Sequence, residues 1–376
     1  MAKSLRPKFE MHVVSGDFRR SRESQLISFI DEQYLGLDAM ADNPAVLFTG
    51  PAGSGKTLLA MEATRRELAQ GRTGRLLCFN RLLGLRLADE MGDKGQLIVG
   101  TLHQELLRIG GIKPPPNAPR SFWEHDLPDM ALSVLLERGE DFVRDFIVVD
   151  EVQDVARPQF LDVLDLLVVG GLGGGRVLMF GDFARQAIFG NGDGRNLLKT
   201  LRPGLVLSRL VSNCRNLPRI GHVVNMFSNL DPGYQHFRRL DDGADPSFLS
   251  FSRGQDQSGL VADSIRRLQA EGFNLNEIAV LSPLRDGSTA EVTKDPWLRQ
   301  ILSAADGLPP RTGRVQFSTV QSFKGLEASA VVLTDLDGAL VPNFESLLYI
   351  GLTRPTDRLI AIVESGTLRA ALGRPA

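Results

Sequence analysis

An apolar run at residues 146–149 ends on two adjacent acids, Asp150 and Glu151. A short run of buried apolar residues is typical of an inner strand in a parallel sheet. Carboxylates at the end of such a strand are costly to desolvate unless they meet a cation or take part in chemistry. A strand that runs out into solvent would also end on acids, and the acids taken alone favour that simpler interpretation.

The segment GPAGSGKT changes this balance because it follows a predicted strand and opens a predicted helix. This is the context of a phosphate-binding P-loop, whose glycines let backbone N–H groups face an anion at a helix N-terminus. Lys56 is expected to reach the β- and γ-phosphates, and the hydroxyl of Thr57 to bind Mg²⁺. The predicted nucleotide-binding residues of the loop are Gly50, Gly53, Ser54, Gly55, Lys56 and Thr57.

The P-loop gives the acid pair a chemical use. In P-loop proteins a neighbouring strand ends in an acid that holds Mg²⁺, and Asp150 fits that position. Glu151 can orient and deprotonate an attacking water molecule. The charge of the divalent cation would offset the desolvation cost of both carboxylates. The residues therefore predict a nucleoside triphosphatase that uses Mg²⁺.

Strands and helices alternate along the chain in a way that can position these residues. The clearest helix is expected over residues 57–70. The alternation predicts an α/β fold of parallel sheets covered by helices. We expect an N-terminal extension at 1–30, a first lobe at 31–205 and a second lobe at 206–376. The strands are expected at 45–50, 75–80, 96–101, 146–151 and 176–182, then at 247–251, 277–283, 315–320, 330–336 and 358–364.

Composition narrows the class of protein. The 376 residues are 43% hydrophobic and 23% charged, as in globular proteins, with room for two domains. The net charge of −2 gives no global basic field, although a local groove can still be basic. Two distant cysteines offer no disulfide framework or metal spacing. We find no signal peptide and no apolar run near the ~20 residues of a membrane span, so the expected location is the cytoplasm.

Further short segments follow the P-loop in a fixed order. The acid pair lies in VVDEVQD, at residues 148–154. The others are LLCFNRLL (76–83), GTLHQ (100–104), GDFARQAIFG (181–190), SNCRN (212–216), TVQSFKGLEASAVVL (319–333) and LLYIGLTRPTDRL (347–359). Together they resemble the motifs of superfamily 1 helicases of the UvrD/Rep group. The resemblance runs from about residue 31 to 364 and implies two RecA-like lobes.

This resemblance implies roles for residues that the local pattern leaves open. Arg215 and Arg354 would reach the γ-phosphate across a cleft between the lobes, although the usual place of an arginine is a surface ion pair. Gln186 would sense the γ-phosphate, Glu327 would hold the ribose and Gln33 would read the adenine. The whole would be an ATP-dependent DNA helicase or translocase that acts in DNA repair or phage defence.

The implied track is single-stranded DNA lying across both lobes, with RNA as the alternative. Aromatic residues such as Phe189 would stack on bases without sequence preference. Core packing is an equally good interpretation of Phe79, and His103 could be a satisfied polar residue near a strand end. The implied nucleic-acid-binding residues are Phe79, Asn80, Thr101, His103, Phe189, Thr319, Gln321 and Ser322.

The chain departs from the family pattern in four places. Cys214 stands where the family has an adenine-stacking tyrosine, Gln321 replaces a histidine, and Pro355 replaces an alanine at a position that we expect to open a helix. Short gaps between motifs leave no room for large accessory subdomains, which puts strand separation in doubt. The alternative is a nucleic-acid-stimulated ATPase switch that works without unwinding, with a nuclease, repair or defence protein as its partner.

Overall fold

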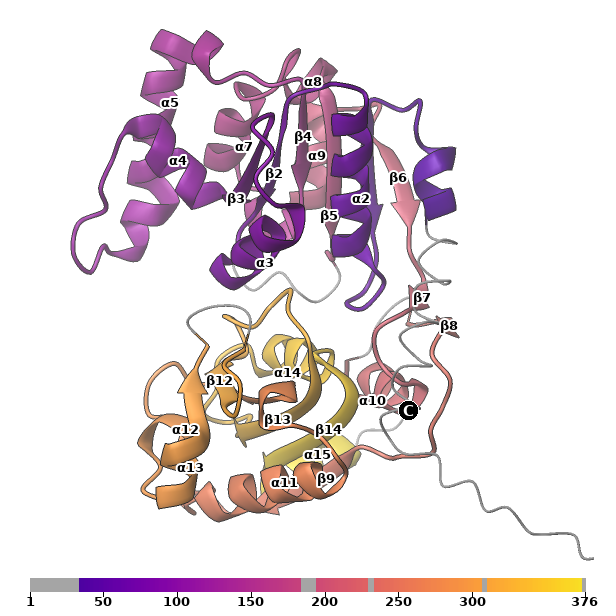
Figure 1. Ribbon diagram of the computed structural model, residues 1–376, viewed down its shortest axis with the longest axis vertical. Coiled ribbons are helices and arrows are strands. Elements are labelled where there is room, and N and C mark those ends of the chain that lie inside the picture. Colours follow the sequence, from indigo (N-terminus) through magenta and orange to yellow (C-terminus); the bar gives the residue numbers. More distant parts are fainter. Residues whose placement is uncertain (1–33, 184–193, 229–232, 306–309, 374–376) are drawn as a thin grey trace, which may run out of the picture.

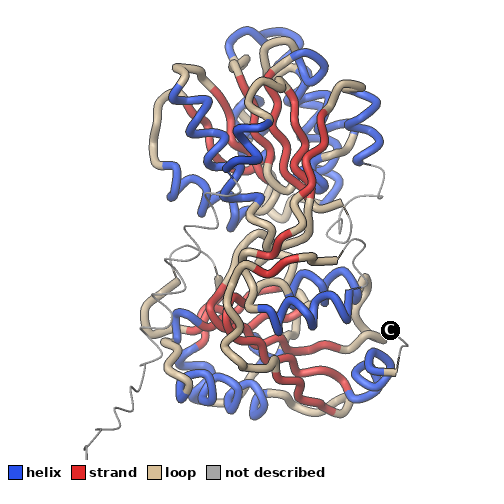
Figure 2. Tube along the Cα trace, turned by 90° about the vertical axis from the view of Figure 1, so that its right-hand side faces the viewer, coloured by secondary structure: helices blue, strands red, loops and turns tan. Residues whose placement is uncertain are grey.

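The computed structural model describes residues 34–183, 194–228, 233–305 and 310–373. The described chain forms two lobes, one above the other in Figure 1, joined by a narrower waist. A small pair of strands, β7 (Ser212–Asn213) and β8 (His236–Phe237), lies in this waist (Figure 2). We call the described residues up to 210 the N-terminal lobe and those from 211 onward, which include the waist, the C-terminal lobe.

The N-terminal lobe is a parallel sheet with helices on its faces (Figure 1). Its strand order is β3-β2-β4-β5-β1-β6. The strands are β1 (Ala45–Thr49), β2 (Gly74–Cys78), β3 (Leu97–Thr101), β4 (Phe146–Val149), β5 (Arg176–Gly181) and β6 (Val206–Arg209). The longer helices are α2 (Lys56–Ala69), α3 (Arg81–Met91), α4 (Leu102–Gly110), α5 (Leu127–Arg138), α7 (Pro158–Asp165) and α9 (Gly194–Leu201).

The C-terminal lobe repeats this architecture, with strand order β11-β12-β10-β13-β14-β9 and parallel pairing throughout. Its strands are β9 (Ser247–Phe251), β10 (Ile278–Ser282), β11 (Leu302–Ala304), β12 (Val315–Thr319), β13 (Ala328–Leu336) and β14 (Pro355–Glu364). Its helices include α10 (Pro218–Ser228), α11 (Ser258–Ala270), α12 (Thr289–Val292), α13 (Pro296–Ile301), α14 (Phe344–Leu352) and α15 (Ser365–Leu372).

The predicted α/β class with two parallel sheets is confirmed. Because β6 pairs with β1, the N-terminal sheet includes residues beyond the boundary expected at 205. The expectation for Pro355 was wrong: it begins β14 rather than a helix. Proline is tolerated at the first residue of a strand because its missing N–H is not needed there.

Burial of β4 on both faces fixes where the acid pair lies. Phe146 and Val148 pack into one apolar cluster of the lobe, and Ile147 and Val149 into the other. All four side chains are fully buried, as the continuous apolar run predicts. The strand therefore delivers Asp150 to the edge of the sheet that faces the C-terminal lobe.

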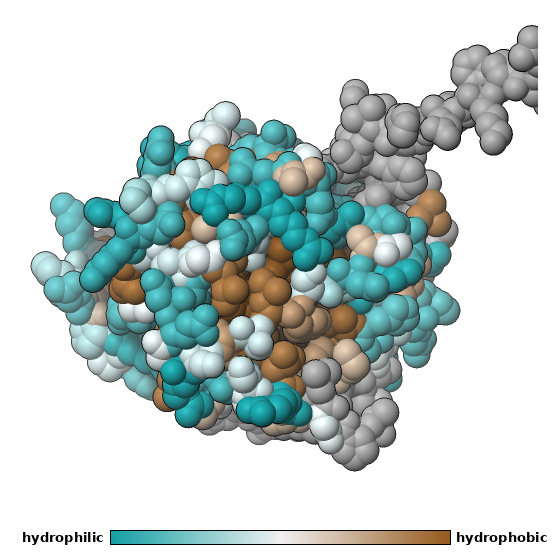
Figure 3. Space-filling model, turned by 90° about the horizontal axis from the view of Figure 1, so that it is seen from below, coloured by the Kyte–Doolittle hydropathy of each residue, from teal (hydrophilic) through white to brown (hydrophobic). Residues whose placement is uncertain are grey.

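The outer face of the C-terminal lobe carries apolar side chains gathered near its centre and ringed by hydrophilic ones (Figure 3).

None of the helices within the described ranges has the length and apolar character that crossing a bilayer requires.

Candidate active site

The loop between β1 and α2 wraps around the side chain of Lys56. The Lys56 Nζ donates hydrogen bonds to the carbonyl oxygens of Gly50, at 2.8 Å, and Pro51, at 2.9 Å. Gly55 has a left-handed backbone, with φ of 85°, and no described side chain caps the first turn of α2. By contrast, side chains cap α3 and α4. The first turn of α2 thus keeps N–H groups for an anion.

Lys56 is buried among acids. Burial lowers the pKa of this lysine, and three nearby carboxylates, led by Asp182, oppose the shift. In the part of the chain that the structure describes, Lys56 Nζ donates only to carbonyl oxygens of its own loop, and it can transfer these hydrogen bonds to a phosphate. The loop therefore has the chemical properties of a phosphate site.

Asp150 lies beside Thr57 at the end of β4. Its Oδ1 accepts a hydrogen bond from the backbone N–H of Glu151 at 2.9 Å. Within the described ranges, nothing donates a hydrogen bond of ordinary geometry to its buried Oδ2. Burial, with the charge of Glu151 second, raises the pKa of Asp150 to about 6, and the Thr57 hydroxyl opposes this. An under-bonded buried carboxylate next to a hydroxyl fits a Mg²⁺ site completed by phosphate and water.

Glu151 has a backbone conformation that is uncommon for its residue type. Its φ of 54° and ψ of 43° are left-handed. Strained residues of this kind concentrate at functional sites. Gln153 Nε2 donates to its carboxylate, and Gln153 Oε1 accepts from the N–H of Asp182 at 2.9 Å. The strained backbone and the glutamine together hold the Glu151 carboxylate at the edge of the sheet.

Arg215 and Arg354 approach this loop from the C-terminal side of the molecule. Both line one cavity of about 410 Å³ together with Lys56, Thr57 and Glu151. The structure therefore brings together five of the residues that the sequence predicts for the triphosphate. The cavity also contacts Cys214 and Glu327.

The Arg354 side chain is 1% exposed and is held by its own lobe. It donates to the carbonyl oxygens of Ile350 (2.9 Å) and Leu326 (3.0 Å) and to the hydroxyl of Thr353 (2.8 Å). Burial, with Arg215 second, lowers the pKa of Arg354 to about 10. It therefore stays cationic at neutral pH in a rigid setting, which favours an anion in the cavity.

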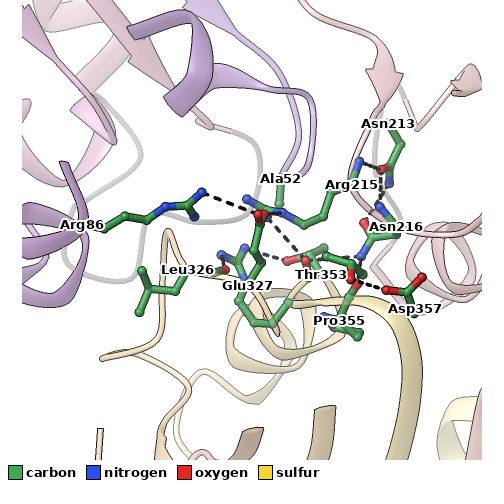
Figure 4. Close-up of polar contacts among 12 residues, drawn as sticks. Ala52, Arg86, Asn213, Arg215, Asn216, Leu326, Glu327, Thr353, Pro355 and Asp357 are labelled. Carbon is green, nitrogen blue, oxygen red and sulfur yellow. Dashed lines mark hydrogen bonds and ion pairs between the residues drawn. The ribbon is translucent and has the colours of Figure 1, made fainter. Parts of the chain in front are cut away.

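Glu327 joins two arginines at the mouth of the cavity, as Figure 4 shows. Its carboxylate lies 2.7 Å from Arg215 Nε and 3.6 Å from Arg86 Nη2. Partial desolvation opposes ionisation, but the charges of Arg215 and Arg86 outweigh it and lower the pKa of Glu327 to about 2. Sequence analysis missed Arg86 because it looks like an ordinary surface residue of an amphipathic helix.

The SNCRN segment packs directly on the P-loop. The N–H of Cys214 donates to the carbonyl oxygen of Gly53 at 2.9 Å. A Cβ on Gly53 would lie 3.1 Å from the Cβ of Arg215, and Gly53 also has a φ of +78°. The close approach and the positive φ both require glycine at this position.

Two tyrosines that sequence analysis missed hold the same loop. Tyr349 OH accepts from the N–H of Ala52 at 2.8 Å and donates to Asp182 at 2.8 Å. Tyr234 OH donates to the carbonyl oxygen of Ala52 at 2.7 Å. Burial raises the pKa of both hydroxyls, so they stay protonated. Tyr349 lies within the apolar run of α14, and a buried tyrosine hydroxyl usually has a hydrogen-bond partner, so the sequence did contain a signal for this residue.

The predicted nucleic-acid residues of the N-terminal lobe have structural partners. The side-chain oxygen of Asn80 caps α3, and its Nδ2 donates to the carbonyl oxygens of Gln321 (3.1 Å) and Ser322 (3.0 Å) across the lobes. Thr101 caps α4 in a reciprocal capping box with Gln104. Both residues therefore stabilise the fold, and the contacts of Asn80 also reach the C-terminal lobe.

Phe79 and His103 belong to an aromatic cluster. Their ring centroids lie 4.8 Å apart, edge to face, and His103 also meets Trp123 and Phe160. The guanidinium of Arg157 lies 5.9 Å from the ring centroid of Phe79. Phe79 is half-buried and packs against the core of the N-terminal lobe, so the structure shows the packing and the predicted stacking stays a prediction.

The C-terminal residues of the predicted track form one turn after β12. The Thr319 hydroxyl donates to Ser322 Oγ at 2.9 Å and accepts from the N–H of Ser322 at 3.0 Å. Ser322 is exposed and Gln321 half-buried. The predicted residues Gln33, Gln186 and Phe189 lie outside the described residues, so the predictions for them stay predictions.

His103 leads to a prediction about pH. Burial lowers the pKa of His103 to about 4, with a hydrogen bond to the Trp123 backbone acting in the opposite direction. Since the unfolded chain binds this proton more tightly, His103 makes the fold less stable as pH falls from 6.5 through 4. We expect the free energy of unfolding of the wild type to drop about 2–3 kcal/mol more than that of His103→Phe over this range. Urea unfolding at several pH values measures the difference, and parallel profiles would contradict it.

Comparison with known proteins gives matches of two kinds. A family model described as an AAA domain matches residues 33–190, the part of the chain that carries the P-loop and the acid pair. No curated protein matches. The fold is similar to a solved Arterivirus nonstructural protein 10 helicase in complex with DNA (13% identity, TM-score 0.44) and to a solved PRRSV helicase (12% identity, TM-score 0.42).

The two solved helicases are longer than the part that this chain matches. The alignments cover 89% and 88% of this chain but 65% and 55% of those proteins. The AAA-domain match covers most of the N-terminal lobe and none of the C-terminal lobe.

Proposed function

We propose that this chain is an ATP-dependent motor or switch of the superfamily 1 helicase type, which hydrolyses ATP in the cleft between its lobes when it is bound to single-stranded nucleic acid. The observation that supports this most directly is the cavity lined by both Lys56 and the arginines Arg215 and Arg354. A P-loop alone would suit many nucleotide-binding proteins. Cations contributed by a second lobe are typical of a nucleotide-binding protein whose two lobes close on the terminal phosphate.

The proposed chemistry uses the side chains at their observed positions. Glu151 takes a proton from water, whose oxygen attacks the γ-phosphorus while the bond to the bridging oxygen breaks and ADP leaves. Lys56, Arg215 and Arg354 stabilise the charge on the phosphoryl oxygens. Thr57 and Asp150 would hold Mg²⁺, which neutralises phosphate charge when bound.

The base and ribose are proposed to lie on the Cys214 and Glu327 side of the cavity. Cys214 cannot stack on adenine as a tyrosine would, so we propose that Gln33 carries base selectivity. Glu327 is already ionised and faces the cavity between two arginines, which suits an acceptor for ribose hydroxyls.

The proposed track is single-stranded DNA that crosses the cleft between Phe79 and the turn at residues 319–322. Hydrogen bonds from Asn80 already join these two places. A nucleic acid seated there would contact both lobes and respond to their opening and closing. A role in DNA repair or phage defence, with a protein partner, is part of the proposal.

The experiment is to measure phosphate release from ATP with no nucleic acid, single-stranded DNA, single-stranded RNA and duplex DNA. We expect Mg²⁺-dependent hydrolysis that single-stranded DNA accelerates. Lys56→Ala, purified in parallel, controls for contaminating enzymes and should release no phosphate. A wild-type rate that no oligonucleotide changes would overturn the nucleic-acid part of the proposal.

The second candidate is a switch that binds nucleic acid without unwinding it. The compactness of the C-terminal lobe favours it, because its described elements between β9 and β14 build the sheet and its cover. A forked duplex with a fluorescent strand distinguishes the candidates: a helicase releases the strand with ATP, whereas a switch hydrolyses ATP and leaves the duplex intact.

A further inference from the structure

A buried lysine of the C-terminal lobe reaches the acids of the N-terminal lobe. Lys324 is 1% exposed, and its Nζ lies 2.6 Å from Asp154 Oδ2 and 3.6 Å from Glu151 Oε2. Its partners lie about 170 residues earlier in the chain. A buried ion pair in this position needs an explanation, because an apolar contact would often stabilise the interface equally well.

Lys324 is joined rigidly to the turn that we propose contacts nucleic acid. The N–H of Lys324 donates to the carbonyl oxygen of Gln321 at 3.2 Å, and that of Phe323 to Thr319 at 3.0 Å. Between the turn and the lysine, Phe323 is buried in the core of the C-terminal lobe. A shift of the Thr319–Ser322 turn must therefore move the backbone of Lys324.

At its other end, Lys324 meets the proposed general base. One oxygen of the Glu151 carboxylate, Oε2, accepts from Gln153 Nε2 and also lies 3.6 Å from Lys324 Nζ. Because the local dielectric is low, a small displacement of this ammonium changes the field at Glu151 far more than it would in water. The same displacement would alter where the carboxylate points.

We propose that Lys324 is a positioning residue that couples nucleic acid on the Thr319–Ser322 turn to the orientation of Glu151. The inference rests on the proposed function, and it adds the route by which the track would accelerate hydrolysis. In this proposal, the ion pair with Asp154 keeps the Lys324 side chain next to Glu151 when no nucleic acid is bound.

The test compares Lys324→Met, Asp154→Asn and the double variant carrying both changes. For each, phosphate release is measured at saturating ATP with and without single-stranded DNA, and the ratio of the two kcat values is the readout. If the wild type shows no stimulation, the proposed function fails. If it does, we expect a wild-type ratio of at least about fivefold, the lower end of ordinary coupling between sites.

Lys324→Met should bring the ratio close to one without raising the KM for ATP. The double variant distinguishes coupling from simple charge balance, since it removes both charges of the ion pair. We expect it to regain thermal stability relative to Lys324→Met while its ratio stays near one. Recovery of the ratio in the double variant would overturn the proposal, as would a wild-type ratio in Lys324→Met.

Glu105→Gln is the matched control. Glu105 is a buried carboxylate that pairs with the buried Arg75, 2.7 Å away, within the N-terminal lobe. Its replacement weakens a buried ion pair that touches neither the cavity nor the turn. The control should lose stability and keep the wild-type ratio. Loss of the ratio in the control would show that any weakened buried pair uncouples the lobes, and it would also overturn the proposal.

Discussion

Replacement of Arg354 by alanine is expected to lower kcat for ATP hydrolysis by about 10³–10⁵-fold, the contribution that an arginine makes to charge stabilisation in phosphoryl transfer. The guanidinium lines the cavity with Lys56 and is cationic and fixed by three hydrogen bonds. A group held rigid before the reaction loses little entropy in the transition state. Stopped-flow phosphate release, read as kcat and KM separately, measures the effect, and KM should change little.

The same three hydrogen bonds make a folding control necessary, because alanine removes one hydrogen bond from each of their carbonyl and hydroxyl acceptors. Arg253→Ala supplies one: Arg253 pairs with Asp337, 2.7 Å away, in the same lobe but outside the cavity. It should keep wild-type kcat. If Arg354→Ala melts like the wild type and still turns over at a rate near that of Arg253→Ala, Arg354 does not act on the γ-phosphate.

Glu151→Gln is expected to reduce kcat by about 10²–10⁴-fold, the usual contribution of a positioned base, while ATP still binds. The amide keeps the shape of the side chain but cannot accept a proton from water. Since the P-loop and Asp150 are unchanged, the variant should retain one ATP per chain after rapid gel filtration with Mg²⁺. Asp150→Asn is the contrasting variant, in which retention itself should fall.

Unaltered single-turnover hydrolysis in Glu151→Gln would show that another group activates the water. Asp154 is an alternative acid, since it shares Lys324 with Glu151. The doubly substituted chain, Glu151→Gln with Asp154→Asn, would then identify which of the two accepts the proton.

Local patterns were sufficient to predict most strands of the two sheets and the glycine-rich loop, but not β6 or β11. The apolar run before Asp150 is buried on both faces. Inner strands of a parallel sheet are covered by helices on both sides, so they have continuous apolar sequences. Gly53 and Gly55 of the P-loop likewise have positive φ values, a backbone conformation that favours glycine. These properties depend on neighbours in sequence, so they can be recognised from sequence.

Contacts between the lobes could not be predicted in this way. Lys324, Arg86 and Tyr349 meet partners that are more than 150 residues away in sequence. Lys324 and Tyr349 lie in the motif segments at 319–333 and 347–359, but nothing in the neighbouring residues indicates which distant partner each side chain meets. Only the packing of one sheet edge against the other gives them a function.

The sequence also contains the signals by which Asn80 and Thr101, two of the predicted nucleic-acid-binding residues, cap helices. Thr101 and Gln104 have the spacing of a capping box, and Asn80 precedes a helix. Capping and contact with a track are compatible for Asn80, whose amide also spans the cleft.

The most direct measurement is a structure of the chain with ADP, Mg²⁺ and a fluoride mimic of the transferring phosphoryl group. The account predicts that the mimic lies between Lys56 on one side and the guanidinium groups of Arg215 and Arg354 on the other. Nucleotide density on the P-loop with both arginines still bound only to their own lobe would contradict the claim that the C-terminal lobe completes the active site.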